Sequence, residues 1–337
     1  MTRLDADTPE LALRHAPEPG SHAPEPGSED DGRRMLLLEA REVPLGGVRA
    51  MSVRRALPQR DLPLVGAWCF LDRFGPQVTR MRVEPHPHIG LQTVTWPFVG
   101  EVRHRDTVGS DVVVRRGALN LMTSGAGIAH SEYSVGEDAA PLDALQLWVA
   151  LPEARRHGIP AFEQHEDLPV VVLRASDGGA DGEATVVLGE FAGATSPASV
   201  YTPIVGAELR LPADSHVTLP LNPAWEHALM GIEGEVTVAR ETTIDAEHLL
   251  YLGIRRESVD IETDAGATLF LLGGEPFEDD IVMWWNFVGR SHDEIVEARD
   301  AWETAAARFG HVVGHGAERI PAPPLPAVRL TRRRRRA

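Results

Sequence analysis

Residues 84–132 constrain the fold of this 337-residue chain more than any other stretch. Apolar and polar residues alternate between Thr93 and Val114, and glycines interrupt the pattern at Gly100, Gly109 and Gly117. Such alternation is typical of strands with one buried face, and the glycine-containing breaks are typical of the turns that join them. The stretch therefore predicts short antiparallel strands.

Two pairs of potential metal ligands lie near the ends of this stretch, His86 with His88 and His130 with Glu132. Side chains two residues apart on a strand project from the same face. Two such strands in a small barrel would direct three imidazoles and one carboxylate toward a single ion. A lone His-x-His pair is more often a surface or core feature, but the second pair, about forty residues further on, favours metal binding.

The donor set limits the metal. It contains nitrogen and oxygen without thiolate, which favours Fe, Mn, Ni, Cu or Zn over Ca or Mg. Four protein ligands on an octahedral ion leave two positions open, which suits catalysis better than a structural zinc. Pro85 and Pro87 flank His86, and proline has no N–H for a sheet ladder, so we expect this strand to be irregular or to lie at a barrel rim.

The segments HPHIGLQTVTWPFVGEVRHRDTVGS (86–110) and RRGALNLMTSGAGIAHSE (115–132) closely resemble the pirin family of the bicupin superfamily. The resemblance extends to residues 53–76 and 274–295, and so covers roughly residues 35–305. It implies an all-β fold of two stacked cupin-type β-barrels. It also implies a nonheme Fe(II) centre in the first barrel, with the family's ligands on His86, His88, His130 and Glu132.

The predicted organisation combines this resemblance with local signals. HAPEPGS occurs twice in tandem at 15–28 and cannot bury enough apolar surface to fold, and Ser291 with Glu294 forms a capping-box pattern before a helix. The second barrel lacks the ligand set, so we expect it to be metal-free. The predicted division is a disordered tail (1–34), a metal-binding cupin barrel (35–151), a linker (152–168), a metal-free cupin barrel (169–290), a C-terminal helix (291–308) and a flexible Pro/Arg-rich tail (309–337).

Composition narrows the class of protein. Cys69 is the single cysteine, so no intrachain disulfide can form and a reducing cytoplasm is the simpler location. The formal net charge of −17 argues against nucleic-acid binding, although Arg332–Arg336 form a basic run that we interpret as a flexible end. No apolar run has the length of a membrane span. We expect a soluble, cytoplasmic monomer.

Several other residues have open roles. His104 and Asp106, also two apart, are assigned to structure or to support of the metal ligands. Asp72 fits either support of an imidazole or a turn. Arg54 and Arg55 are expected to be ordinary surface residues. Trp96, Phe98 and Met122 are candidates for either an apolar pocket wall or plain barrel core.

Two functions remain open at this level. The resemblance implies a quercetin 2,3-dioxygenase-type enzyme, in which a flavonol-like substrate and O₂ meet at the metal and ring cleavage releases carbon monoxide. Glu132 would then be both a ligand and the base that takes the 3-hydroxyl proton. The alternative is a metal- or redox-dependent regulator that binds a transcription factor or metabolic enzyme without turnover.

Overall fold

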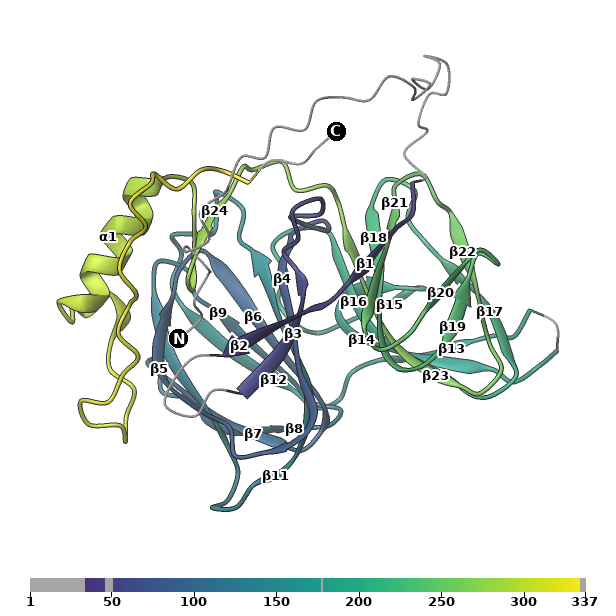
Figure 1. Cartoon of the computed structure of the whole chain (residues 1–337), viewed down its shortest axis with the longest axis horizontal. Helices are drawn as coiled ribbons and strands as arrows, with labels where there is room; N and C mark the ends of the chain where they lie inside the picture. Colours follow the sequence, from purple (N-terminus) through teal and green to yellow (C-terminus); the bar gives the residue numbers. More distant parts are fainter. Residues whose placement is uncertain (1–33, 46–50, 177, 334–337) are drawn as a thin grey trace, which may run out of the picture.

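The computed structural model of the protein describes residues 34–45, 51–176 and 178–333. Within these residues the chain forms two antiparallel β-barrels side by side, and an α-helix flanks the first barrel (Figure 1). This architecture confirms the predicted fold class. Residues 1–33 of the predicted N-terminal tail lie outside the described residues.

The first barrel consists of a seven-stranded and a four-stranded sheet. Its strands are β2 (Arg41–Leu45), β3 (Met51–Leu57), β4 (Trp68–Thr79), β5 (Arg82–His88), β6 (Leu91–Val99), β7 (Glu101–Asp106), β8 (Asp111–Arg115), β9 (Leu119–Thr123), β10 (Ile128–Ser134), β11 (Ala140–Ala150) and β12 (Ala161–His165). The larger sheet has the order β12-β9-β6-β11-β4-β3-β2, and the smaller sheet has the order β5-β10-β7-β8. The smaller sheet therefore pairs the two strands that carry the predicted ligands.

The second barrel is built in the same way. Its strands are β1 (Leu36–Glu39), β13 (Val170–Leu173), β14 (Gly182–Phe191), β15 (Ala194–Thr195), β16 (Ile204–Leu211), β17 (Ser215–Pro220), β18 (Glu226–Gly234), β19 (Val236–Val238), β20 (Thr242–Ile244), β21 (His248–Gly253), β22 (Ser258–Thr263) and β23 (Ala267–Gly274). The larger sheet has the order β1-β21-β18-β23-β16-β14-β13, with β15 paired to β14, and the smaller sheet is β17-β22-β19-β20. Strands β17 and β22 thus occupy the positions that β5 and β10 occupy in the first barrel.

Strand pairing crosses the predicted division of the chain at two places. Leu36–Glu39 fall in the predicted first barrel (35–151), but β1 pairs with β21 of the second barrel. Ala161–His165 fall in the predicted linker, but β12 pairs with β9 and extends the first barrel. Both strands lie at the edge of a sheet. Their positions depend on pairing between residues distant in the sequence, which a local pattern does not reveal.

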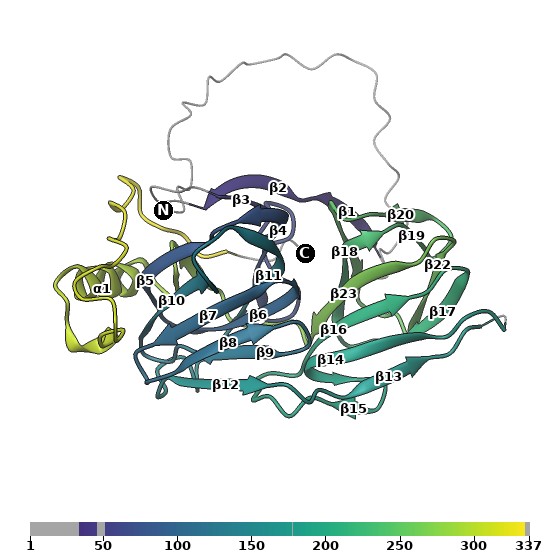
Figure 2. The same cartoon turned by 90° about the horizontal axis from the view of Figure 1, so that it is seen from below.

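The two barrels lie side by side (Figure 2), and one cluster of buried apolar residues contains members from both barrels. Trp68 of β4 is fully buried, and its Nε1 donates to the carbonyl oxygens of Val205 (3.1 Å) and Gly273 (3.2 Å) in the second barrel. Trp96 of β6 donates through Nε1 to Glu208 Oε2 at 2.7 Å. Buried indole N–H groups thus find partners in the other barrel, which fixes the two barrels against one another.

The segment after the second barrel returns to the first barrel. It forms the hairpin β24 (Val282–Trp284) and β25 (Phe287–Gly289), then α1 (His292–Glu303) and a short 3₁₀ turn (Ala307–Phe309). Ser291 caps α1 as predicted, because its side chain accepts a hydrogen bond from the Glu294 N–H. The helix ends at Glu303, before the predicted residue 308, and Ala305 has a positive φ of 53° that is incompatible with helix.

No helix among the described residues is long and apolar enough to cross a membrane.

Candidate metal centre

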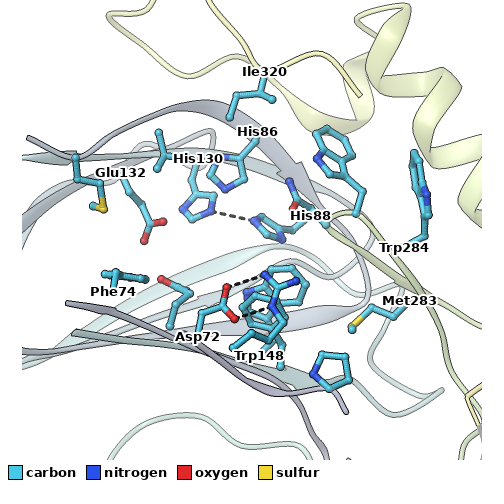
Figure 3. Close-up of a pocket in the computed structure, with 18 of the residues that line it drawn as sticks. Asp72, Phe74, His86, His88, His130, Glu132, Trp148, Met283, Trp284 and Ile320 are labelled. Carbon is cyan, nitrogen blue, oxygen red and sulfur yellow. Dashed lines mark hydrogen bonds and ion pairs between the residues drawn. The ribbon is translucent and has the colours of Figure 1, made fainter. Parts of the chain in front are cut away.

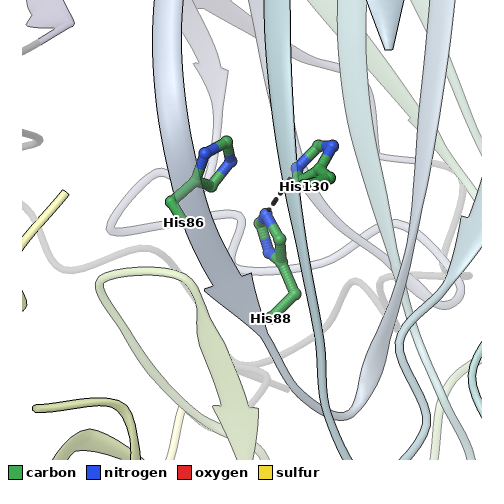
Figure 4. Close-up of side chains that lie close together, drawn as sticks. All are labelled: His86, His88 and His130. Carbon is green, nitrogen blue, oxygen red and sulfur yellow. Dashed lines mark hydrogen bonds between the residues drawn. The ribbon is translucent and has the colours of Figure 1, made fainter. Parts of the chain in front are cut away.

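Three imidazoles converge inside the first barrel. His86 and His88 lie two residues apart on β5, and His130 lies on the neighbouring strand β10, where it pairs directly with His86 (Figure 4). The potential ligand atoms of the three side chains all lie within 4.8 Å of one another, and all three residues are buried. The strand spacing therefore brings together the three histidines that the sequence predicted.

The irregularity of β5 helps to place them. The register between β10 and β5 shifts between His130 and Glu132, which face His86 and Val83 respectively. One extra residue thus lies on β5 at the segment that contains Pro85, which agrees with the expectation of an irregular strand. Such a bulge redirects the neighbouring side chains and is common beside functional sites.

The spacing of two ring nitrogens fits a metal ion. His88 Nε2 and His130 Nε2 lie 3.0 Å apart. Nitrogen ligands about 2.1 Å from an ion lie about 3.0 Å apart when they are at right angles, and about 3.4 Å apart in a tetrahedron. Two acceptor nitrogens this close need a proton or a cation between them. This distance is that of a hydrogen bond between the two rings, and it also fits two ligands at right angles on a divalent ion.

Burial keeps the three imidazoles neutral. It lowers the pKa of His86 to about 4, and it lowers the pKa values of His88 and His130 well below the usual value. The neighbouring histidines lower the pKa values of His88 and His130 further, because each would repel a second positive charge. Neutral imidazoles offer their lone pairs to a metal without first releasing a proton.

The Nδ1 atoms of His86 and His130 have hydrogen-bond partners. His86 Nδ1 lies 2.9 Å from the Glu84 carbonyl oxygen, so this nitrogen carries the proton and Nε2 is free to bind a metal. His130 Nδ1 lies 3.2 Å from His104 Nδ1. His88 Nδ1 has no hydrogen-bond partner among the described residues, although the backbone of Asn286 lies close enough to raise the pKa of His88.

His104 and Asp106 support His130 from behind. His104 Nε2 lies 3.0 Å from Asp106 Oδ2, and Asp106 Oδ1 accepts from the backbone N–H groups of Val108 (3.0 Å) and Ser110 (2.9 Å). Burial alone would raise the pKa of Asp106, but the hydrogen bonds from His104 and Ser110 lower it below its usual value. Asp106, His104 and His130 thus form one chain of contacts that ends at the three converging imidazoles. This agrees with the structural or supporting role predicted for His104 and Asp106.

Glu132 lies beside His130 but apart from the other two histidines. It belongs to a second group of potential ligands with His104 and His130, while the first group contains His86, His88 and His130. Its Oε1 lies 3.3 Å from the Thr95 hydroxyl. Burial raises the pKa of Glu132, whereas His104 and Thr95 act in the opposite direction. A carboxyl group with this bias can accept and hold a proton inside the cavity.

A cavity opens on the three histidines (Figure 3). The residues that line it come from the first barrel, from the β24–β25 hairpin and from the C-terminal segment. They are Arg41, Arg55, Pro58, Phe70, Asp72, Phe74, Met81, Val83, His86, His88, His130, Glu132, Gln146, Trp148, Met283, Trp284, Trp285, Asn286, Ile320 and Arg333.

Several features of this cavity could not be assigned from the sequence. Trp96, Phe98 and Met122, the candidates for its wall, are buried in the barrel and do not line it. The aromatic wall is instead Phe70 stacked on Trp148, with ring centroids 4.0 Å apart. The paired tryptophans of the β24–β25 hairpin were visible in the sequence, but only the return of this hairpin to the first barrel brings them to the cavity.

The surface assignment of Arg55 was wrong. Arg55 is buried and forms a two-point ion pair with Asp72, with both N–O distances at 2.7 Å. Burial raises the pKa of Asp72, and the Arg55 hydrogen bonds act against this rise. Asp72 therefore pairs with a residue of the neighbouring strand β3, and no bond from its carboxylate to an imidazole is formed among the described residues. A single sequence gives no signal for this pair, because Arg55 and Asp72 are 17 residues apart.

A third group of potential ligands, Glu84, His315 and Glu318, lies outside the cavity. Arg82 already pairs with Glu84 (2.6 Å) and with Glu318 (3.0 Å), and His315 Nε2 lies 2.9 Å from Ser131 Oγ. These contacts join the C-terminal segment to the first barrel. We assign this group to docking of the C-terminal segment on the first barrel.

Comparisons with known proteins agree with this architecture. The pirin family model matches residues 50–149, and the model of the pirin C-terminal cupin domain matches residues 206–310. A protein of Pseudomonas aeruginosa named "Putative quercetin 2,3-dioxygenase" is 43% identical over 291 residues, which cover 85% of this chain and 89% of the relative. A "Pirin-like protein" of Caulobacter vibrioides is 35% identical over 296 residues, which cover 86% of this chain and 99% of the relative.

A solved structure shows the same arrangement. The crystal structure of a quercetin 2,3-dioxygenase from Acinetobacter baumannii is similar to this chain with a TM-score of 0.81 and 39% identity. The match covers 88% of this chain and 97% of that structure. Together with both family models and the relatives, this similarity shows that the chain belongs to the pirin family.

Proposed function

We propose that this protein is a nonheme metal-dependent dioxygenase of the quercetin 2,3-dioxygenase type, which cleaves a flavonol-like substrate with O₂. The observation that carries the proposal is the set of three neutral, buried imidazoles that meet beside a proton-accepting carboxyl group in a cavity lined by aromatic rings. The names of the similar proteins from Pseudomonas aeruginosa and Acinetobacter baumannii support the same activity.

The residues present fit a divalent first-row ion. His86, His88 and His130, which form one group of potential ligands, would hold it, and Glu132, which groups with His130, would complete the set as the fourth ligand. We propose Fe(II) as the metal, with Mn, Ni, Cu and Zn as alternatives. When bound, such an ion supplies Lewis acidity toward a phenolic oxygen and an open position for O₂. His104 would keep the ring of His130 in the orientation that this site requires.

The protein groups have separate roles around the ion. Glu132 would accept the proton of the substrate hydroxyl, since burial raises its pKa and so strengthens its hold on that proton. Phe74 and Trp148 would pack against the substrate rings, and the hairpin residue Trp284 would exclude water from the opposite side (Figure 3). Removal of the 3-hydroxyl proton makes a flavonol electron-rich enough to react with dioxygen.

The test is aerobic quercetin turnover by protein that has been reconstituted with Fe(II) under anaerobic conditions. We expect turnover by the wild type and a loss of roughly 100-fold or more in Glu132→Gln. Glu190→Gln, which changes an exposed glutamate of the second barrel, is the matched control and should retain full activity.

Elemental analysis of the same samples separates the two roles of Glu132. If Glu132→Gln keeps its iron but loses turnover, the carboxylate acts as a base. If it loses iron as well, the carboxylate acts as a ligand. Full turnover in Glu132→Gln would refute both roles.

One observation favours the alternative function, a metal- or redox-dependent regulator that binds a protein partner without turnover. His88 lies beside the backbone of Asn286, in the hairpin that covers the cavity. A change in the metal could therefore shift this covering hairpin. Absence of turnover across a panel of flavonols, combined with capture of a protein partner that depends on the oxidation state of the metal, would favour this alternative.

A further inference from the structure

Three arginines line the same cavity as His86, His88 and His130, which we call the histidine triad. Arg41 comes from β2, Arg55 from β3 and Arg333 from the end of the described chain, and all three line the cavity. Arg333 reaches this place because its backbone N–H donates to the Ile281 carbonyl oxygen at 2.7 Å, in a bridge just before β24. Part of the arginine run expected to be a flexible end is thus built into the cavity wall, while Arg334–Arg336 lie outside the described residues.

The charges of this cluster are not balanced. Asp72 neutralises Arg55 through their two hydrogen bonds of 2.7 Å. Arg41 donates to the Pro58 carbonyl oxygen at 3.1 Å, which contributes no charge. Among the described residues, the guanidinium of Arg333 forms no hydrogen bond or ion pair with the protein. In the part of the chain that the structure describes, Asp72 is thus the one carboxylate that forms an ion pair with this cluster of three arginines, in a chain whose formal net charge is −17.

Burial makes this excess costly. It lowers the pKa of Arg333, and the positive charges of Arg41 and Arg55 lower it further. Arg41 is more exposed; its partial burial and Arg55 lower its pKa, whereas Asp72 raises it. Guanidinium groups that repel one another in a partly desolvated cavity are stabilised by an anion that enters between them.

An aromatic wall connects the arginines to the triad. The Arg55 guanidinium lies 4.5 Å from the centre of the Phe70 ring, and Phe70 stacks on Trp148. Trp148 then meets the His88 ring edge-on, with centroids 5.4 Å apart. A flat aromatic ligand that lies along this wall would have one end at the histidines and the other end near the arginines.

We propose that the substrate of this cavity is an aromatic acid, whose phenolic end faces the histidine triad and whose carboxylate is bound by Arg333 and Arg41. The planar fork of a guanidinium matches a carboxylate in two-point geometry, and the stacked rings of Phe70 and Trp148 suit a flat acid. This inference rests on the proposed function, because it assigns the substrate class of the same site. It predicts that quercetin, which has no carboxylate, is a poorer ligand than an acidic phenol.

The first experiment uses metal-free protein, so that the carboxylate has no metal to bind. Isothermal titration calorimetry with benzoate and with benzamide compares two ligands of nearly the same shape that differ in charge. We expect benzoate to bind roughly tenfold or more tightly than benzamide, and we expect Arg333→Gln to abolish this preference. Equal affinities for the two ligands, or an unchanged preference in Arg333→Gln, would overturn the proposal.

The neighbouring residue provides a matched control. Arg332 is exposed and does not line the cavity, so Arg332→Gln removes the same charge and should retain the preference for benzoate. Arg41→Gln is the second test variant, because it leaves the docking of the C-terminal segment intact. A preference for benzoate that falls equally in Arg332→Gln would mean that net charge alone is responsible, which contradicts the proposal.

The second experiment uses protein loaded with Zn(II), which has no redox chemistry, and compares 3,4-dihydroxybenzoate with catechol. We expect the acid to bind roughly tenfold or more tightly in the wild type and to lose this advantage in Arg333→Gln. Neither experiment requires turnover. Loss of the preference in a protein that cleaves quercetin would therefore overturn the substrate class alone, and the preference without turnover would overturn the dioxygenase proposal alone.

Discussion

The two barrels have the same strand order but different interiors. In the first barrel, β5 and β10 direct three histidines and Glu132 inward. In the second barrel, the corresponding strands β17 and β22 direct Val217, Leu219, Val259 and Ile261 into an apolar cluster. The comparison shows that one backbone scaffold becomes either a filled core or a metal-capable cavity according to a few inward-facing side chains.

The difference has an energetic side. The four apolar residues of the second barrel stabilise it by burial. The imidazoles of the first barrel are buried against their preference for water, and their low pKa values report this cost. A bound ion would offset the cost. We therefore expect the first barrel to depend on a metal and the second barrel to be independent of it.

The largest expected effect is a loss of metal affinity when a histidine is removed from the first barrel but not from the second. His88→Ala removes one imidazole from the triad, and we expect metal affinity to fall by more than the roughly 100-fold that loss of an outer partner causes. His227→Ala removes a histidine of the second barrel that is also buried, with a pKa lowered by burial to about 4, and it should retain the metal. Elemental analysis after dialysis measures both. A metal that stays in His88→Ala, or one that is lost in His227→Ala, would contradict the assignment of the site.

The next effect concerns acid stability of the metal-free protein. His86 binds a proton near pH 4 in the folded state, whereas an unfolded chain binds one near pH 6.5, so unfolded chains take up protons first as the pH falls. The contribution of His86 to the free energy of unfolding is fully present above about pH 6.5 and is lost as the pH falls toward 4. We expect a loss of roughly 2 to 3 kcal/mol by pH 4.5.

Denaturant unfolding at several pH values measures this slope. His86→Asn should reduce it, and His227→Asn should reduce it by a similar amount, because burial lowers both pKa values to about 4. A full slope in His86→Asn would show that His86 takes up its proton at nearly the same pH in the folded and the unfolded protein, which contradicts a pKa lowered by burial. Because no metal is present in this experiment, equal reductions in the two variants would show that burial alone lowers the pKa values in both barrels.

The smallest expected effect is a loss of metal affinity when His104, which contacts His130, is replaced. His104→Phe removes the hydrogen bond to His130 Nδ1 but keeps a ring that can stack on Phe162. We expect metal affinity to fall roughly 10- to 100-fold, less than in His88→Ala. Competition with a chelator gives the dissociation constant. His248→Gln, in the second barrel, is the control, and an unchanged constant in His104→Phe would show that His104 serves the fold alone.

Local sequence signals predicted much of the site. The spacing of His86, His88 and His130 indicated one face on each of two strands, and the structure brings these side chains together. Ser291 indicated the start of α1 because an N-cap depends on neighbours within one turn. The assignment of these residues and Glu132 as metal ligands stays a proposal.

Long-range packing decided what the local signals missed. The burial of Arg55 depends on Asp72 in the next strand, and the position of Arg333 depends on Ile281. The assignment of β1 to the second barrel and of β12 to the first barrel depends on their pairing with β21 and with β9, respectively. None of these partners lies within the range over which a sequence pattern repeats.

The sequence by itself determined the strand rhythm, the family and the three histidines, because strand periodicity and ligand spacing are local properties of the chain. The tertiary structure alone decided which charges share the cavity, how Glu132 stands relative to the triad, and which segments cover the first barrel. The physical reason is that a side chain's charge balance and burial are set by residues distant in the sequence, and only folding brings those residues within reach.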